Sequence, residues 1–173
     1  MYYTWVQSAW GKMLLASDGE HLNGAWFEGQ PTIKLSAEAI CKDDLPVFAA
    51  AKQWLQDYTD GNKPACLPVL EPFGSAFQKE VWELLLKIPY GRVTTYREMA
   101  LCIARHHHYR RECPQSIGNA LKHNPISIFI PCHRVIGSDA SLVGYAGGIE
   151  KKRLLLCHEQ ADLSHPVSLT AEK

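Results

Sequence analysis

Three prolines in a short stretch divide the chain into two regions with different patterns of apolar residues. The stretch is NKPACLPVLEPFGS, residues 62–75, and each proline removes a backbone donor and fixes φ, so no helix runs through it. A chain of 173 residues can bury a core as one domain or as two small ones. We therefore expect two domains, residues 1–70 and 71–173.

The first region is typical of a sheet with one helix. KMLLASDGEHLNGAWFEG, residues 12–29, predicts a hairpin with its turn at SDGE. LPVFAAAKQWLQDYTDG, residues 45–61, has apolar residues at helical spacing and predicts a helix that ends at Gly61. The apolar face predicted for this helix comprises Val47, Ala50, Ala51, Trp54, Leu55 and Tyr58.

The second region begins with three short helices. The first follows a cap at Ser75 and ends before Pro89, and the second is capped by Thr94 or Thr95. The third starts at Pro114 and ends at Asn124 and Pro125. Three short helices with a basic bias are typical of a helix-turn-helix module, whose third helix would enter a DNA groove.

The remainder of the second region is predicted to combine strand, loop and helix. ISIFI, residues 126–130, reads as a buried strand that leads into Cys132. A glycine-rich loop, residues 137–148, follows, and IEKKRLLLCHE, residues 149–159, predicts a closing helix.

Charge is distributed unevenly along a chain whose formal net charge is zero. Residues 1–70 hold five lysines and eight acids, whereas residues 71–173 hold six lysines, seven arginines and ten acids. Between residues 92 and 134, six arginines and Lys122 face only Glu98 and Glu112. A local basic patch on a neutral protein favours a polyanionic partner bound by one face, although a solvated basic surface would give the same pattern.

The chain lacks the marks of a membrane or secreted protein. Its apolar runs fall short of the roughly 20 residues that a membrane helix needs, and no basic leader precedes an apolar run at the start. Its cysteines form no C-x-x-C pair, and we expect free thiols and a cytoplasmic location. They are Cys41, Cys66, Cys102, Cys113, Cys132 and Cys157.

The adjacent Cys132 and His133 are candidates for nucleophilic chemistry. A free thiol has a pKa of about 8.5, so a nucleophilic cysteine needs a base or a positive potential beside it. Neighbours along a strand point to opposite faces, so direct contact between the two side chains should not be assumed. An exit into a turn would return the ring to the thiol directly or through a water, with Glu159 as a candidate orienting carboxylate.

Longer motifs around this pair resemble one protein family. IPCHRVIG (130–137), preceded by IGNALKHNP and followed by GYAGG and LLLCHE, is similar to the active-site motif of the O6-alkylguanine-DNA alkyltransferases, or methylated-DNA–protein-cysteine methyltransferases. The resemblance extends to FQKEVWELLLKIPYGRVTTYREMA (77–100) and, more weakly, to LNGAWFEGQ (22–30). It implies an α/β fold, with a small ribonuclease-H-like amino-terminal domain and a helical, winged helix-turn-helix-like carboxy-terminal domain.

The resemblance also implies an activity and roles for single residues. The alkyl group of O6-alkylguanine in double-stranded DNA, and of O4-alkylthymine as a further candidate, would pass to Cys132 after base flipping, and the monomeric protein would act once without metal or organic cofactor. His133 would take the thiol proton through a water, Glu159 would orient His133, and Tyr96 would assist flipping and donate to the departing purine. Implied DNA contacts are Gln115, Ser116, Asn119, Arg134 and Thr95, and implied pocket residues are Asn124, Tyr145 and Ala146.

Two features depart from the family pattern. The family usually has an arginine at the head of the recognition helix to fill the gap left by the extruded base, and Gln115 stands there in this chain. The connection CIARHHHYRREC (102–113) is also about five residues longer than usual. Arg110 or Arg111 in that connection could take over the missing arginine's task.

Alternative functions leave other marks on a sequence. The extended connection offers zinc-type ligands in Cys102, His106, His108 and Cys113, at a spacing that matches no common finger. A non-catalytic lesion-binding module would lack Cys132. A cysteine hydrolase would show a substrate-class motif, and a DNA-binding regulator would tolerate the loss of the thiol.

Overall fold

The chain forms two compact units in a computed structural model that describes residues 1–30, 33, 35–62, 64, 66–108 and 113–169. The first unit comprises Met1–Phe73 together with Pro125–Phe129. The second comprises Gly74–Asn124 and Ile130–Lys173. Arg110 and Arg111, the predicted substitutes for the missing arginine, lie outside the described residues.

The described residues of the first unit form a mixed sheet of four strands. They are β1 (Tyr2–Ser8), β2 (Gly11–Ser17), β3 (Leu22–Phe27) and β4 (Ile40–Cys41), in the order β3-β2-β1-β4. β2 pairs antiparallel with β1 and with β3, whereas β4 runs parallel to β1. The predicted hairpin is therefore confirmed, and Gly19 in its turn has φ of +122°, a conformation that glycine adopts without a Cβ penalty.

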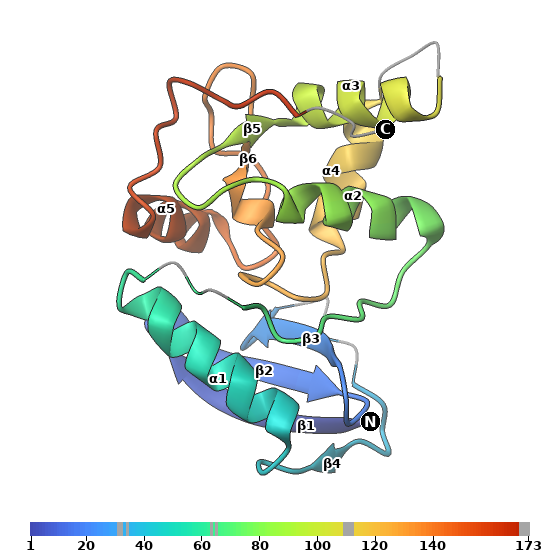
Figure 1. Cartoon of the computed structure of the whole chain (residues 1–173), viewed down its shortest axis with the longest axis vertical. Coiled ribbons are helices and arrows are strands. Elements are labelled where there is room, and N and C mark those ends of the chain that lie inside the picture. Colours follow the sequence, from blue (N-terminus) through green and yellow to red (C-terminus); the bar gives the residue numbers. More distant parts are fainter. Residues whose placement is uncertain (31–32, 34, 63, 65, 109–112, 170–173) are drawn as a thin grey trace. The chain divides into compact units, whose positions relative to one another are not determined.

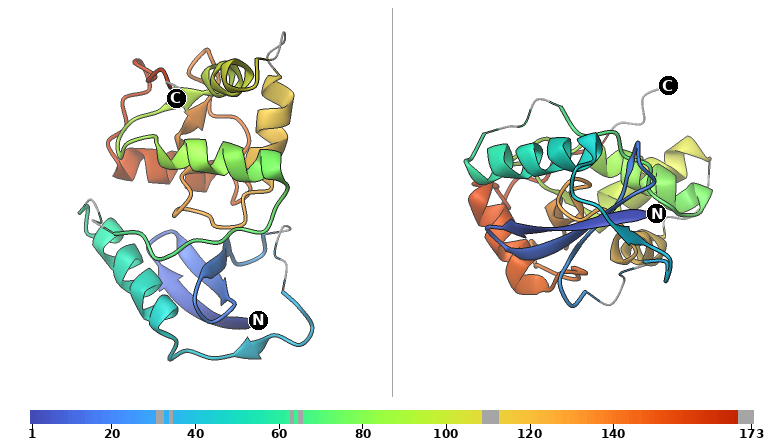
Figure 2. Two further views of the ribbon diagram at one scale, coloured as in Figure 1. Left: turned by 45° about the vertical axis from the view of Figure 1, so that its right-hand side comes forward. Right: turned by 90° about the horizontal axis from the view of Figure 1, so that it is seen from below.

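The helix α1 (Pro46–Thr59) packs against this sheet, as both views of the unit show (Figure 1, Figure 2). Its buried face confirms the predicted helix except at one position. Ala50 is exposed, and Phe48 lies in the core instead. The helix ends at Thr59 with Asp60 as its cap, and Gly61 follows with φ of +78°, which only glycine adopts readily. The buried side chains are Val47, Phe48, Ala51, Trp54, Leu55 and Tyr58.

The second unit contains the three predicted helices and a closing one. The first is α2 (Ala76–Leu86), where Ser75 and Gln78 form a capping box. In α3 (Tyr96–His106), Thr95 is the cap, because its hydroxyl accepts the N–H of Glu98 at 3.0 Å. The others are α4 (Pro114–Lys122) and α5 (Ile149–His158). No helix among the described residues is long and apolar enough to cross a membrane.

Long-range contacts hold the start of α3 beside the segment that follows Cys132. Cys132–Arg134 forms a single 3₁₀ turn and continues into β6 (Val135–Ile136), which pairs in parallel with β5 (Thr94–Thr95). Trp82 of α2 donates its indole N–H to the backbone carbonyl of Ala120 in α4, at 3.0 Å. The thiol and the three helices therefore belong to one packed unit.

The prediction of a strand at residues 126–130 is wrong. Ile126 makes a single bridge to Ala25 of β3, and Ile128 then turns with φ of +72°, which is rare for a β-branched residue. Ala25 donates its N–H to the carbonyl of Pro125 and accepts the N–H of Ser127, both at 2.8 Å. This pairing with β3 explains why the stretch is apolar and buried without being a strand.

We predict that Phe129→Ala lowers the free energy of unfolding of the first unit by about 3–5 kcal/mol, as expected for the loss of a buried ring. Phe129 is 2% exposed, and its ring centroid lies 4.6 Å from that of Trp54. Urea unfolding followed by tryptophan fluorescence measures the change. The matched control is Phe73→Ala, since Phe73 is 62% exposed. Equal effects of the two substitutions would contradict the assignment of residues 125–129 to this core.

Candidate active site

The thiol of Cys132 lies inside the second unit. The residue is 4% exposed and opens the 3₁₀ turn after Pro131. The side-chain amide of Asn124, which follows α4, donates to Cys132 Sγ at 3.1 Å and to the carbonyl of Ile130 at 2.9 Å. Asn124 therefore links the end of α4 to the backbone on one side of the thiol and to the thiol itself.

His133 forms a buried pair with Glu159. The imidazole Nε2 and the carboxylate Oε1 lie 2.8 Å apart, and neither side chain is exposed. A carboxylate only accepts hydrogen bonds, so Nε2 carries the proton and Nδ1 of a neutral ring keeps its lone pair. No described residue forms a hydrogen bond with Nδ1. Burial lowers the pKa of His133 below its ordinary value, so the ring is neutral and Nδ1 can accept a proton.

Glu159, which caps α5, accepts hydrogen bonds from His133, Arg134 and Gly91. Besides His133, Arg134 donates Nε to Oε2 and Nη2 to Oε1, both at 2.8 Å, and the N–H of Gly91 donates to Oε2 at 3.0 Å. Burial raises the pKa of the carboxyl, but the hydrogen bonds from His133 and Arg134 outweigh it and hold the pKa well below its ordinary value. Glu159 is therefore an anion.

Arg134 lies within the unit. Its Nη1 donates to the carbonyl of Ile88 at 2.7 Å, and its other donors face Glu159. The prediction that Arg134 contacts DNA is not favoured by this position, which instead suits an ion pair that fixes Glu159.

Lys152 is a site residue that the sequence analysis missed. It is fully buried on α5, and its Nζ donates to the carbonyls of Val135 at 2.6 Å and Val143 at 2.7 Å. Burial lowers the pKa of Lys152 to about 8. A signal was present in the sequence, because Lys152 stands three and four residues before Leu155 and Leu156, on the buried face of the helix.

Burial is also the largest influence on the pKa of the Cys132 thiol. It raises the pKa of Cys132, and the hydrogen bond from Asn124 and the charge of Lys152 reverse only part of that increase. The resting sulfur is therefore a protonated thiol, and its activation requires a base.

The start of α3 and the glycine-rich loop each supply one tyrosine to this region. Tyr96, at the start of α3, donates its hydroxyl to the carbonyl of Val143 in the loop at 2.9 Å. The ring of Tyr145 stands edge-on to that of His133, with centroids 6.5 Å apart. Tyr145 and Ala146 are both half-buried. Burial raises the pKa of Tyr96 to about 12, so its hydroxyl stays protonated.

The remaining predicted DNA contacts lie on α4 and at the start of α3. Gln115 and Asn119 are exposed and Ser116 is half-buried, whereas Ile117 and Ala120 face the core. Thr95 is buried, with its hydroxyl engaged in capping α3. The exposed face of α4 is thus polar, as a helix that contacts DNA requires.

Comparisons with known proteins agree with this arrangement. A family model described as "6-O-methylguanine DNA methyltransferase, DNA binding domain" matches residues 76–161. A methylated-DNA–protein-cysteine methyltransferase of Haemophilus influenzae is 39% identical, over 90% of this chain and 84% of the relative. The chain belongs to the methylated-DNA–protein-cysteine methyltransferase family. An archaeal member from Methanosarcina barkeri is 40% identical, over 94% of this chain and 99% of its own.

A solved structure of this methyltransferase family shares the fold. The crystal structure of Mycobacterium tuberculosis OGT in complex with DNA superposes with a TM-score of 0.80 at 34% identity, over 92% of this chain and 93% of that one. The expected α/β fold, with a sheet-containing amino-terminal part and a helical carboxy-terminal part, is confirmed.

We predict that Glu159→Gln destabilises the protein by about 3 kcal/mol or more, because it leaves Arg134 buried without its anion. The matched control is Glu150→Gln on the same helix, which breaks only an exposed pair with Arg153 and should leave stability almost unchanged. Urea unfolding curves of the two variants give the comparison. A small effect at Glu159 would mean that the buried pair contributes little to the fold.

Proposed function

We propose that this chain repairs DNA by moving the alkyl group of O6-alkylguanine onto its own Cys132. Methyl transfer from O6-methylguanine in DNA to a protein cysteine is the activity of the family to which the chain belongs. One observation supports the assignment above all others. A buried thiol directly precedes a neutral histidine whose Nδ1 can take a proton and whose Nε2 is held by an anionic carboxylate.

The proposed reaction is a single displacement. His133 Nδ1 takes the proton of Cys132 through a water, and Glu159 stabilises the cation that forms. The sulfur then attacks the alkyl carbon, an S–C bond forms, and the C–O6 bond breaks with its electrons on the purine. The proton finally reaches the purine, which becomes ordinary guanine. The product is a thioether, which has no ready leaving group, so each molecule acts once. The step uses no metal or organic cofactor.

The partner is double-stranded DNA, and the second unit binds it. An alkylated guanine inside a duplex must leave the stack before a buried thiol can reach it. The exposed face of α4, with Gln115, Ser116 and Asn119, contacts the duplex, and Asn124, Tyr145 and Ala146 border the extruded base. The hydroxyl of Tyr96 would release the carbonyl of Val143 and donate a hydrogen bond to the departing purine instead.

The chemistry of the thiol also bears on where the protein acts in the cell. Cys132 must stay reduced, and all six cysteines, which lie within the described residues, are free thiols, which suits the cytoplasm. A stoichiometric reaction between one thiol and one base needs a single chain, and we propose a monomer. O4-alkylthymine is a further candidate substrate, since it presents the same alkyl–oxygen bond.

We predict that incubation with a duplex containing O6-methylguanine adds one methyl group to the protein, on Cys132. Intact mass spectrometry and peptide mapping locate it. Cys132→Ser should abolish the gain, whereas Cys157→Ser, at an exposed thiol, should not. A parallel duplex with O4-methylthymine tests the second substrate. Methylation of another cysteine, or repeated turnover, would contradict the proposal.

We predict that Gln115→Arg speeds repair of duplex DNA and hardly changes reaction with free O6-methylguanine base. Unstacking a base costs a few kcal/mol, which an inserted side chain partly offsets, and arginine stacks on bases better than glutamine does. Single-turnover rates on both substrates measure the effect. Gln53→Arg on α1 adds the same charge in the first unit and serves as control. Equal changes on both substrates would show that Gln115 does not limit base flipping.

A further inference from the structure

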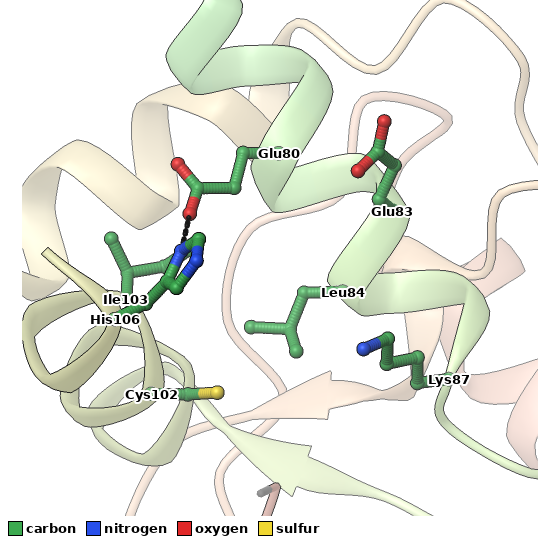
Figure 3. A pocket seen from close by; sticks show the side chains of 7 residues that line it. All are labelled: Glu80, Glu83, Leu84, Lys87, Cys102, Ile103 and His106. Atoms are coloured by element: carbon green, nitrogen blue, oxygen red, sulfur yellow. Dashed lines mark hydrogen bonds and ion pairs between the residues drawn. The ribbon is translucent and has the colours of Figure 1, made fainter. Parts of the chain in front are cut away.

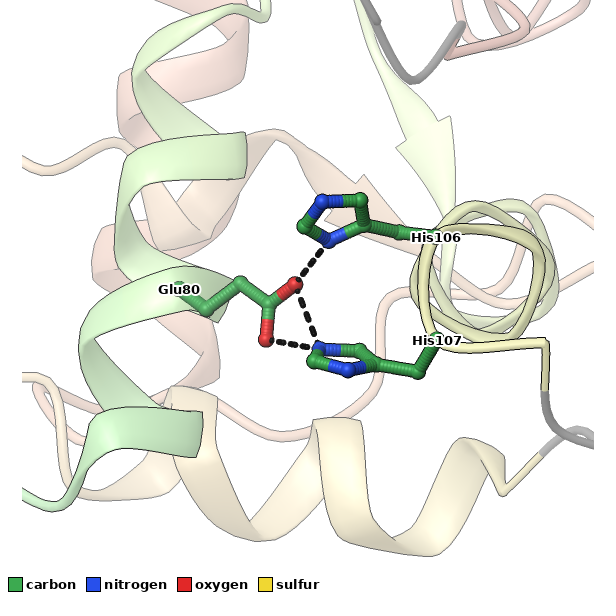
Figure 4. A group of neighbouring side chains, drawn as sticks. All are labelled: Glu80, His106 and His107. Atoms are coloured by element: carbon green, nitrogen blue, oxygen red, sulfur yellow. Dashed lines mark hydrogen bonds and ion pairs between the residues drawn. The ribbon is translucent and has the colours of Figure 1, made fainter.

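The start of the extended connection after α3 meets α2 at a cluster of three side chains. Glu80 comes from α2, His106 is the last residue of α3, and His107 follows it (Figure 4). Glu80 Oε1 lies 2.7 Å from His106 Nδ1, and Glu80 Oε2 lies 2.7 Å from His107 Nε2. One ligand atom from each residue lies within 4.8 Å of the other two.

The sequence analysis considered a different set of ligands in this region. Within the described residues, no other group of three histidine, cysteine or acidic side chains brings its ligand atoms so close, and the set of Cys102, His106, His108 and Cys113 is therefore not assembled. Cys113 instead contacts the hydroxyl of Ser116, at 2.9 Å. The third ligand-type residue, Glu80, lies more than twenty residues upstream, where spacing rules could not indicate it.

We propose that Glu80, His106 and His107 form a zinc site that fastens the end of α3 to α2. Two imidazoles and one carboxylate are a ligand set that zinc uses, with water in the fourth position. Each ring proton that now faces Glu80 would move to the other nitrogen of its ring, and the freed nitrogen would bind the ion.

The two contacts of Glu80 require only small movements to accept an ion. Ligand atoms at about 2.0–2.1 Å from a tetrahedral zinc ion lie about 3.3 Å from one another. The contacts of 2.7 Å between Glu80 and the two rings would therefore widen by less than an ångström. The rings are already close, with centroids 4.9 Å apart.

Access and charge also favour an ion. The side chains of His106 and His107 are 60% and 37% exposed, and that of Glu80 is 23% exposed, so solvent can deliver the ion and the fourth ligand. Burial raises the pKa of Glu80, but the hydrogen bonds from His107 and His106 outweigh it and keep the carboxylate ionised. The adjoining pocket is lined by Glu80, Glu83, Leu84, Lys87, Cys102, Ile103 and His106 (Figure 3).

A zinc ion here would have a structural role. His106 and His107 stand where α3 ends and the long connection to α4 begins, and α4 carries the proposed DNA contacts. An ion bound only by the folded unit raises its stability by mass action. We expect zinc to raise the melting temperature of the protein and to leave the attacking thiol untouched.

Zinc titration of the metal-free full chain, by calorimetry and by competition with a chelating dye, tests the proposal. Glu80→Gln and the double variant His106→Gln, His107→Gln should each bind zinc about tenfold or more weaker, since even outer-sphere partners are worth about 10–100-fold. Two substitutions serve as controls: Glu83→Gln, at a residue that lines the same pocket, and His108→Gln, at the residue that follows the cluster. Both variants should bind zinc as tightly as the unsubstituted protein does.

The readouts separate the zinc site from other outcomes. Zinc binding that survives both cluster variants but disappears when thiols are blocked would place the ion on cysteines and overturn the proposal. So would the absence of binding in the unsubstituted protein, which would leave the three side chains as a hydrogen-bonded contact between helices. Because binding and melting are measured without DNA, the result does not depend on the proposed methyl transfer.

Discussion

The buried carboxylate of Glu159 fixes the geometry on which the candidate site depends. It accepts from the ring of His133 and the fork of Arg134, which are neighbours in the 3₁₀ turn, and from the backbone of Gly91, which lies in a separate segment between α2 and β5. A buried anion without such partners would be too costly to keep charged. Gly91 admits no larger residue, since a Cβ there would lie 2.9 Å from the carbonyl oxygen of Glu159 and its φ is +74°. The orientation of the base is thus tied to the packing of the unit.

A second set of contacts surrounds the sulfur of Cys132. These contacts lower the pKa of the thiol, whereas burial raises it. Asn124 and Lys152 both favour a thiolate, yet burial keeps the thiol protonated. A thiol that stays protonated at rest but has groups beside it that favour the thiolate suits a residue that must react only when substrate is bound. Lys152 also bonds the carbonyls of Val135 and Val143, so the same cation joins the segment after the thiol to the glycine-rich loop.

Much of this structure could be predicted from local sequence signals, and the rest depends on long-range contacts. Ser75, Thr95, Pro114 and Gly61 act on their own helix ends, and the predicted elements begin or end beside them. ISIFI was misread because a buried segment that makes one bridge to β3 has the same composition as a strand. The burial of Arg134 and of Lys152 could not be predicted from the sequence, because a basic side chain is normally exposed. Only the fold reveals the carboxylate or carbonyls beside each of them.

The path of the chain at residues 125–129 makes the first unit discontinuous in sequence. After Asn124 the backbone leaves the second unit, adds five residues to the first beside β3, and returns at Ile130, just before the thiol. A gene fragment that ends at Phe73 would encode a sheet whose β3 lacks its bridge to Ile126. A fragment that starts at Gly74 would carry Ile126, Ile128 and Phe129 into a protein that must cover them in another way. A chimaera that exchanges either unit between relatives therefore has to keep residues 125–129 matched to the first unit.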